Sequence, residues 1–328
     1  MRVACALALA ALLVLPLFLS SYAVTLFIFI FFYAYLGQAW NIVGGYAGQL
    51  SAGHAAFVGV GAYASAMLSM HAGLTPWIGM FIGGALSACL GVVIGYLGFR
   101  FGLRGFYFVL LTVAFAEICR IVALNTEATG GAQGLYIMFT GNPRQFQFQD
   151  NRVYYYVALG LMLGATGIAA WIERHRFGAY LSAIRDDEAA AEALGVDTFR
   201  YKMLAMTISS FLTGVGGTFY AFYLFSLQPN AVFGIPLSVE IIIRPIVGGA
   251  GTLLGPIVGT AVFIFVREIV SSQWEHHELI VGLVAILVVI FAPRGLVGLW
   301  RDLLGSIGER EPEAESGVPA ETGRRVEQ

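Results

Sequence analysis

Long apolar runs separated by short polar intervals dominate the chain from its start to about residue 292. A helix that crosses a bilayer needs about 20 predominantly apolar residues. Runs of this kind occupy residues 3–20, 22–42, 54–70, 76–98, 105–124, 153–172, 201–225, 236–270 and 278–292. The pattern predicts an all-α, polytopic membrane protein.

The run at 236–270 is interrupted by a glycine-rich stretch, GGAGTLLGP, at residues 248–256. It is compatible with one tilted helix or with two short helices joined by a turn. Cytoplasmic loops carry an excess of lysine and arginine, and two crossings would put 13 of the 18 basic residues on the cytoplasmic side. We therefore expect about ten transmembrane segments with both termini in the cytoplasm. Arg144 and Arg152 then lie outside, while Arg120, Arg244 and Arg267 lie within spans.

The two ends of the chain differ in character. The N-terminus has a basic start and an alanine-rich core, as a signal peptide does, but further apolar runs follow at once, which favours a retained first helix. The residues after Gly305 are rich in Glu, Pro, Gly and Ser, so we expect a disordered cytoplasmic tail. The predicted domains are a transmembrane domain at 1–304 and this tail at 305–328.

A polar interval at residues 174–202 separates the sixth and seventh predicted spans and carries five of the 18 basic residues. Its middle, residues 182–194, is rich in alanine and glutamate, which are good helix formers. Asp186 and Asp187 lie near the start of this predicted helix, where the helix dipole favours negative charge, and Glu188 and Glu192 follow within it. Gly195 lies where a left-handed cap would end the helix. This predicts a short amphipathic helix in the cytoplasm, either a solvated connection or a docking helix for a cytosolic partner.

Composition narrows the classes of function. The chain is 58% hydrophobic and only 12% charged, whereas soluble domains are about 25% charged, so a multi-span membrane protein is expected. A net charge of −2 gives no sign of nucleic-acid binding, and the three cysteines have no metal or disulfide spacing. Since the chain has no P-loop, no HExxH and no nucleophile elbow, we expect no catalytic residues, no metal site and no ATPase of its own. Movement of a substrate is the natural function.

The stretch NIVGGYAGQLSAGHAAFVGVGAYA, at residues 41–64, is rich in glycine. Non-helical backbone at membrane depth is tolerated only where protein or a water-filled cavity covers it. The glycines therefore serve either close helix packing or a broken segment beside a translocation path. In the second interpretation, polar side chains of this stretch line the path: Asn41, Gln49, Ser51 and His54. For His54, a buried packing histidine is the alternative.

Two pairs of opposite charges lie inside predicted spans. Glu117 and Arg120 are three residues apart, and Glu240 and Arg244 are four apart, spacings that put each pair on one helix face. Ionisable residues inside a membrane are functional candidates by default. Glu117 and Glu240 are therefore candidates for the translocation path, with internal ion pairs that fix helix packing as the alternative.

Five stretches carry a resemblance to a known family, and they occur in the family's order across about residues 41–294. They are GGYAGQLSAGHAAFVGVGAYA (44–64), RGFYFVLLTVAFAEICR (104–120), TGGAQG (129–134), FGAYLSAIRDDEAAAEALGVDTFRYK (177–202) and GGAGTLLGPIVGT (248–260). Together they resemble the LivH/LivM permeases of ATP-binding-cassette (ABC) transporters, and most nearly the LivM branch.

The resemblance implies a permease subunit in the bacterial inner membrane that moves branched-chain or related amino acids. Two cytosolic ABC ATPases would use the ATP, a LivH-like second permease would complete the path, and a periplasmic solute-binding protein would deliver the small-molecule substrate. No cofactor is expected in this chain. Residues 174–202 look like the coupling segment that docks on an ATPase. The residues expected to act there are Arg185, Asp186, Asp187, Glu188, Glu192 and Gly195.

The chain departs from the family's pattern in two places. The importer motif EAA, three residues, Gly would put a glutamate six residues before Gly195, but Glu188 is seven residues before it. Arg244 and Pro245 interrupt an otherwise apolar stretch, and relatives of this family also move urea, short amides and aromatic acids, which are alternative substrates.

A different class of transporter is the remaining alternative. A secondary transporter driven by an ion gradient would show inverted repeats with paired broken helices. The glycine-rich stretches at 44–53 and 248–256 are candidates for such a pair, although the two halves of the chain show no sequence similarity.

Overall fold

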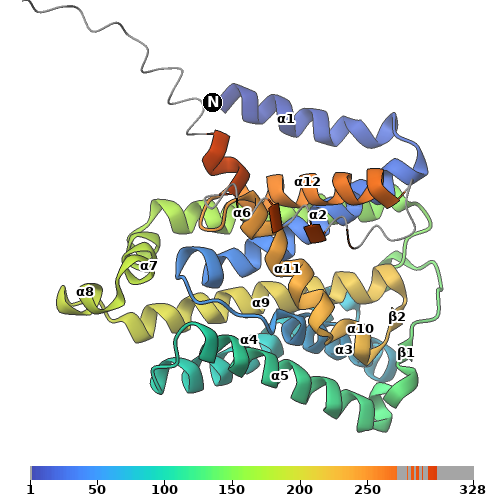
Figure 1. Cartoon of the computed structure of the whole chain (residues 1–328). Coiled ribbons are helices and arrows are strands. Elements are labelled where there is room, and N and C mark those ends of the chain that lie inside the picture. The colour runs from blue at the N-terminus through green and yellow to red at the C-terminus, as the bar shows by residue number, and fades with distance from the viewer. Residues whose placement is uncertain are drawn as a thin grey trace, which may run out of the picture.

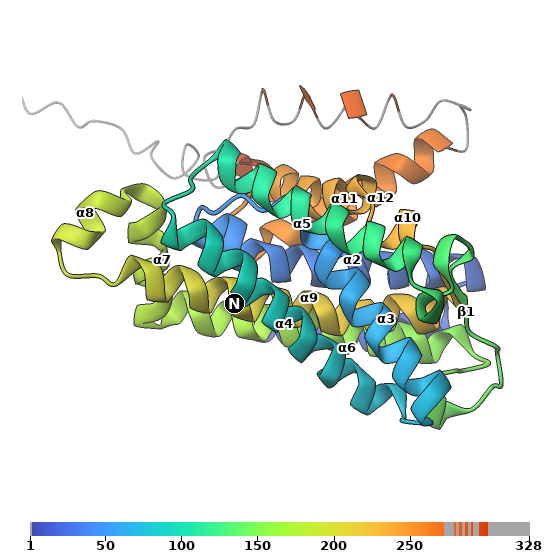
Figure 2. The same ribbon diagram turned by 90° about the horizontal axis from the view of Figure 1, so that it is seen from below.

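The computed structural model describes residues 2–271, 279, 282–283, 286–287, 290 and 295–300. Over these residues the chain forms a bundle of helices that lie side by side, with one short pair of strands at one end (Figures 1 and 2). The predicted all-α, polytopic membrane class is confirmed by this architecture and by the apolar helices within it.

The long helices are α2 (Ser21–Asn41), α3 (His54–Ala72), α4 (Pro76–Arg100), α5 (Phe106–Asn125), α6 (Asn151–Arg174) and α9 (Thr198–Leu224). The shorter helices are α1 (Arg2–Val14), α7 (Arg176–Asp186), α8 (Glu188–Ala193), α10 (Pro229–Val232), α11 (Ile235–Gly248) and α12 (Gly255–Ser271). Strand β1 (Leu135–Tyr136) pairs antiparallel with β2 (Ser226–Leu227), with Leu135 opposite Leu227. This pairing ties the loop that follows α5 to the end of α9.

In the described part of the chain, six helical segments are long and apolar enough to cross a membrane. They are Ser21–Tyr46, His54–Ala72, Pro76–Arg100, Phe106–Asn125, Asn151–Arg174 and Pro229–Gly248. Helix α9 has 27 residues but is not among them, and serine, threonine and glycine residues are frequent along it and lower its mean hydropathy. Such a helix is suited to contact with other helices rather than with lipid.

Three predicted spans differ from the structure or lie beyond it. Helix α1 ends at Val14 and a 3-10 turn follows at Leu15–Leu17, so this helix is shorter than the predicted span at 3–20. The run at 236–270 forms two helices, α11 and α12, with a glycine turn between them. The predicted span at 278–292 lies mostly, and the predicted tail at 305–328 entirely, outside the described residues. The total of about ten crossings stays a prediction.

Helix α9 lies in the middle of the bundle, with α2 on one side and α3 and α4 on the other (Figure 1). Glycines allow the backbones of α3 and α9 to approach each other closely. A Cβ on Gly61 of α3 would overlap the backbone of Gly214, and one on Gly217 would overlap the carbonyl of Val58. Small residues are what helices use to pack in a membrane, where apolar side chains gain little over lipid.

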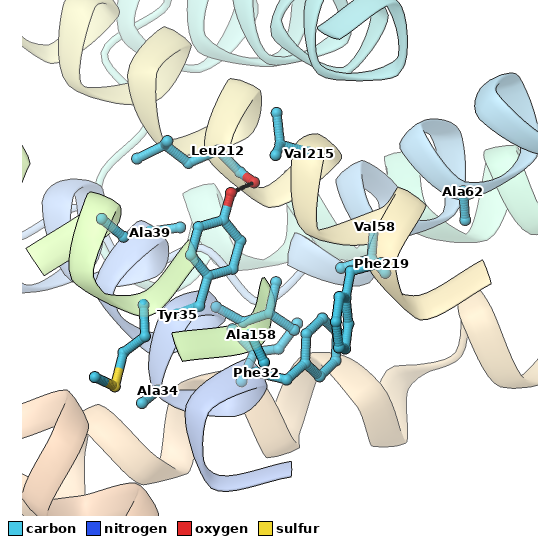
Figure 3. Packing of buried hydrophobic residues seen from close by; sticks show 14 of the residues in the cluster. Phe32, Ala34, Tyr35, Ala39, Val58, Ala62, Ala158, Leu212, Val215 and Phe219 are labelled. Carbon is cyan, nitrogen blue, oxygen red and sulfur yellow. Dashed lines mark hydrogen bonds between the residues drawn. The ribbon is translucent and has the colours of Figure 1, made fainter. Parts of the chain in front are cut away.

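The opposite face of α9 packs on aromatic side chains of α2. The Tyr35 hydroxyl donates a hydrogen bond of 2.5 Å to the carbonyl of Leu212, and the ring of Phe32 stacks on Phe219 with centroids 5.2 Å apart (Figure 3). A buried hydroxyl without a partner would cost about 1–3 kcal/mol. The tyrosine thus fixes the register of α2 against α9 as well as filling the core.

Helices α7 and α8 protrude at one end of the bundle, opposite the β1–β2 pair (Figures 1 and 2). The sequence predicts one helix at 182–194, and this is wrong because the chain breaks at Asp187. Its backbone is extended (φ −156°, ψ 105°), and its side chain accepts hydrogen bonds from the N–H groups of Ala189 and Ala190, which makes it the N-cap of α8. Gly195 adopts the predicted left-handed conformation, with φ +86°.

The glycine packing gives a testable pair of variants. Gly61→Ala places a methyl group against the backbone of α9, and overpacking of this kind costs about 1–3 kcal/mol. Gly164→Ala, in the middle of α6, has open space around its Cβ and should be neutral or slightly stabilising, because alanine is the better helix former. Thermal unfolding in detergent should show a lowered midpoint for Gly61→Ala only. Equal midpoints for the two variants would contradict the close packing of α3 on α9.

Candidate functional site

The protruding segment is anchored to the bundle by Glu188, at the start of α8. Its carboxylate, with 10% of the side chain exposed, pairs with the Lys202 ammonium of α9, and its other oxygen lies 3.2 Å from Nε of Arg104. Lys202 is 4% exposed and sits 5.0 Å above the ring of Phe99. Glu188 therefore connects α8 to α9 and to the loop between α4 and α5. This inward placement differs from the expected docking contact.

A second anchor is Arg185, at the end of α7. Its Nη1 donates to the carbonyl of Gly45 at 3.2 Å, in the π-helical turn (Ile42–Tyr46) that extends α2. The same guanidinium lies against Gly251 in the turn between α11 and α12, leaving no room for a Cβ there. Arg185 thus contacts both glycine-rich breaks of the chain at once.

The other predicted coupling residues are exposed, although two of them also form hydrogen bonds within the segment. Glu192 accepts a hydrogen bond of 2.5 Å from the Thr198 hydroxyl, and Asp187 caps α8, so both act within the segment. The side chain of Asp186 is 72% exposed and lies 3.3 Å from Arg185. Gly195 ends the segment. Of the acids predicted for docking, Asp186, Asp187 and Glu192 are exposed, and Glu188 is the one that is partly covered.

The tip of the protrusion carries one exposed leucine, which sequence reasoning missed. Leu194 is 86% exposed. It borders a hollow of about 190 Å³ that is also lined by Tyr180, Val196, Arg200 and Tyr201. A leucine beside the capping glycine of this polar segment was the available signal. Arg104 and Lys202 were missed too, although Lys202 is the only lysine of the chain.

Asn41 holds the glycine turn between α11 and α12 in place. Its Oδ1 accepts from the N–H of Gly251 at 2.7 Å, and its Nδ2 donates to the carbonyl of Thr252 at 3.1 Å. Gln38, one turn earlier on α2, donates to the carbonyl of Leu253 at 2.6 Å. These amides satisfy backbone groups that a turn at membrane depth would otherwise leave unpaired.

His54 is fully buried at the start of α3 and takes part in a directed chain of hydrogen bonds. Ser209 Oγ donates to the carbonyl of Ala39 at 2.7 Å, so it accepts from His54 Nε2 at 2.9 Å. Nδ1 of His54 then accepts from Ser51 Oγ at 2.9 Å. The imidazole is neutral and fully paired, as the packing alternative for His54 requires.

Of the four polar residues predicted to line a path in this stretch, Gln49 has solvent access. Asn41, Ser51 and His54 are at most 1% exposed, whereas Gln49 is half-buried in a loop whose neighbour Leu50 is 46% exposed. Its Nε2 donates to the carbonyl of Ala47 at 3.2 Å. The three buried residues fix the break between α2 and α3 in this conformation. Their assignment to a translocation path stays a prediction.

Both predicted ion pairs are present. The carboxylate of Glu117 receives two hydrogen bonds from the Arg120 guanidinium, and Arg120 Nη1 also donates to Asn230 Oδ1 of α10 at 2.6 Å. Glu240 lies 3.2 Å from Nη2 of Arg244. The structure thus brings each pair together as the helix spacing predicted.

The two pairs differ in their surroundings. Arg244 is 1% exposed, and its guanidinium carbon lies 3.6 Å from the ring centroid of Tyr33, on α2. Arg267 of α12 approaches Glu240 at 3.6 Å, so this pair holds α2, α11 and α12 together. The side chain of Glu117, by contrast, is 46% exposed.

A larger hollow of about 650 Å³ lies between α3, α4 and α5. Its lining is almost entirely apolar and includes Val60, Met67, Leu86, Ile118 and Phe233. An apolar lining favours contact with hydrocarbon over contact with a charged solute, because a charge placed there would find no polar partner. Within the described residues, no group of three or more His, Cys, Asp and Glu side chains is arranged to hold a metal ion.

Fold and site define the class: an all-helical, multi-span membrane protein of the permease type, with a peripheral helical segment anchored to its core. The chain belongs to the family described as the permease component of branched-chain amino acid transport systems, whose model matches residues 22–292.

Individual proteins that are similar to this chain are also transport permeases. The chain is 30% identical to the high-affinity branched-chain amino acid transport system permease protein LivM of Salmonella typhimurium, over 88% of this chain and 73% of the relative. It is also 30% identical to LivM of Escherichia coli, over 90% of this chain and 76% of the relative. A ribose import permease protein, RbsC of Haemophilus influenzae, is 24% identical over 49% of this chain and 55% of the relative. No solved structure matches the chain.

The hydrogen-bond chain at His54 can be tested with two buried serines. Ser209→Ala removes the acceptor of His54 Nε2 and should cost about 1–3 kcal/mol of stability, the usual penalty for an unpaired buried donor. Ser65→Ala is the matched control, because Ser65 is equally buried and its Oγ has no partner in the described part of the chain. Thermal unfolding should separate the two variants. A larger loss for Ser65→Ala would refute the assignment.

Proposed function

We propose that this chain is one of two permease subunits of an ATP-driven importer for branched-chain amino acids in the bacterial inner membrane. Family membership and 30% identity to two LivM proteins over most of both chains support this function. The observation that carries it is the protrusion formed by α7 and α8, which is tied to three different parts of the bundle while its tip stays exposed.

The partners follow from the same proposal. A LivH-like permease completes the translocation path, two cytosolic ABC ATPases bind below and use the ATP, and a periplasmic solute-binding protein delivers the amino acid. This chain contributes no cofactor and no catalytic group. Since the binding protein selects much of the substrate, transport of other small amides or amino acids is compatible with the same permease.

The proposed topology has about ten crossings and both termini in the cytoplasm. It puts α7 and α8 on the cytoplasmic side, where basic residues are enriched. The opposite end, with the β1–β2 pair, then faces the periplasm (Figure 1). In this topology the coupling segment at 174–202 lies where a cytosolic ATPase can reach it.

In the proposed mechanism, α7 and α8 act as one lever. Movement of the ATPases displaces the protrusion, and Glu188 passes the force to α9 and to the loop before α5. Arg185 passes it to the turn that ends α2 and to the glycine turn after α11. Both glycine-rich breaks thus move with the lever. ATP binding would favour one of two packed arrangements and so shift the population between inward- and outward-facing states.

The docking contact is best tested at the exposed tip. Leu194→Asp should lower the amount of ATPase that co-purifies by about tenfold, because an apolar anchor at the centre of an interface is commonly worth 1–2 kcal/mol or more. Met138→Asp is the matched control, since Met138 is 85% exposed on the opposite loop. A pull-down in mild detergent measures both. Equal recovery of the ATPase with the two variants would exclude Leu194 from the interface.

Glu188 calls for a different test, because it faces inward. Glu188→Gln leaves the buried Lys202 ammonium unpaired and should cost about 3 kcal/mol of stability. The double variant Glu188→Gln/Lys202→Met should recover much of this loss but should hydrolyse ATP with little amino-acid uptake, because the lever is loosened. Thermal unfolding, ATPase activity and uptake in vesicles give the three readouts. Normal uptake by the double variant would remove Glu188 from force transmission.

Energy coupling distinguishes the proposed importer from a gradient-driven carrier. Uptake into vesicles with clamped ion gradients should stop when ATP is depleted or vanadate is added. Uptake that persists under these conditions would contradict the importer and favour the secondary transporter.

A further inference from the structure

The ion pair of α5 lies deep in a predicted membrane span. Glu117 and Arg120 follow the start of the helix at Phe106 by 11 and 14 residues, which places them about 16 and 21 Å along an axis of about 30 Å. Glu117 therefore lies near the middle of the helix, and Arg120 lies about 9 Å from its C-terminal end. Side-chain exposure is nevertheless 46% for Glu117 and 26% for Arg120.

Exposure at this depth is unusual, because charges in contact with lipid are costly and membrane helices turn them inward. The second pair of this chain is more covered, since Arg244 is 1% exposed under Tyr33 and Glu240 is 32% exposed. Helix α5 runs along the surface of the bundle (Figure 2). Only four of its 20 residues are buried. The open side of the Glu117–Arg120 pair must therefore face water or another polar surface.

The groups at this place are complementary to an amino acid. The chain offers a carboxylate at Glu117, a guanidinium at Arg120, and the side-chain amide of Asn230, which is bonded to the guanidinium. Arginine binds carboxylates with two parallel hydrogen bonds. A zwitterion can exchange with the internal pair and leave each charge matched, whereas a simple cation or anion would leave one of the two unpaired.

The neighbouring surface suits an aliphatic side chain. Val113 and Val109 precede Glu117 by one and two helical turns, and the i, i+4 spacing puts all three on one stripe of α5. Both valines are half-buried, so part of each is open beside the charged pair.

We propose that Glu117, Arg120 and Asn230 form a transient binding site for the α-ammonium and α-carboxylate groups of an aliphatic amino acid within the translocation path. The ammonium pairs with Glu117, the carboxylate pairs with Arg120, and the aliphatic chain lies along Val113 and Val109. Asn230 positions the guanidinium. This inference rests on the proposed importer function and adds the place and chemistry of recognition inside this chain.

Photo-crosslinking tests the location. The complete transporter in nanodiscs, with its partner subunits and binding protein, is irradiated with photo-leucine, an aliphatic amino acid that carries a diazirine. Peptides of α5 and α10 should be labelled. Excess leucine should abolish the label, whereas 4-methylpentanoic acid and isoamylamine, which each lack one charged group, should not. Labelling confined to other helices, or equal competition by all three compounds, would overturn the site.

Variants test the charges. Glu117→Gln and Arg120→Gln should each lower labelling and ATP-driven leucine uptake by about tenfold, the effect of a lost charge-assisted contact. The exchange Glu117→Arg/Arg120→Glu keeps an ion pair and should keep ATPase co-purification, yet should not restore uptake. Arg144→Gln is the control, because Arg144 is an exposed arginine in the loop between α5 and α6, and this variant should stay within twofold of wild type.

The outcomes separate this inference from the proposed function. If wild type binds the ATPases and takes up leucine with ATP, while both single variants do so within twofold, the site is refuted and the importer stands. If the exchanged variant transports normally, the pair serves packing against a second subunit. If wild type neither binds an ATPase nor responds to ATP, the importer itself fails.

Discussion

Close contact between helix backbones is the constraint on which this structure depends. In lipid, apolar side chains gain little by leaving the hydrocarbon, so helices associate through tight packing and hydrogen bonds. Helix α9 meets this demand with glycines against α3 and with a carbonyl that receives the Tyr35 hydroxyl of α2. Near its start, the same helix carries Lys202, the partner of Glu188. The central helix of the bundle is thus also an attachment point of the protrusion formed by α7 and α8.

The two glycine-rich breaks of the chain lie in contact with each other. The break after α2 and the turn between α11 and α12 are far apart in sequence, but Asn41 bonds directly to Gly251, and Arg185 lies against both segments. Irregular backbone at membrane depth is stable only when protein covers it, and here the two breaks cover one another. Arg185 therefore connects α7 to both breaks at once.

The two ion pairs within predicted spans share one helical spacing but differ in their surroundings. Both follow the helical spacing that brings opposite charges onto one face. Arg244 is enclosed by Tyr33 and shared, through Glu240, with Arg267, so its role is to hold helices together. Glu117 lies on the outer surface of its helix with 46% of its side chain exposed, and Arg120 is 26% exposed. Surroundings, rather than spacing, separate a structural pair from a candidate site.

The sequence by itself determined what depends on local composition and periodicity. Apolar length predicted the membrane helices, residue spacing predicted both ion pairs, and Gly195 predicted a left-handed cap. Tertiary structure decided the rest, because it depends on which groups find partners across the bundle. Spacing alone did not reveal the break at Asp187 or the inward turn of Glu188 toward Lys202. Burial of His54 likewise follows from hydrogen bonds to α9, 155 residues away, which no local pattern contains.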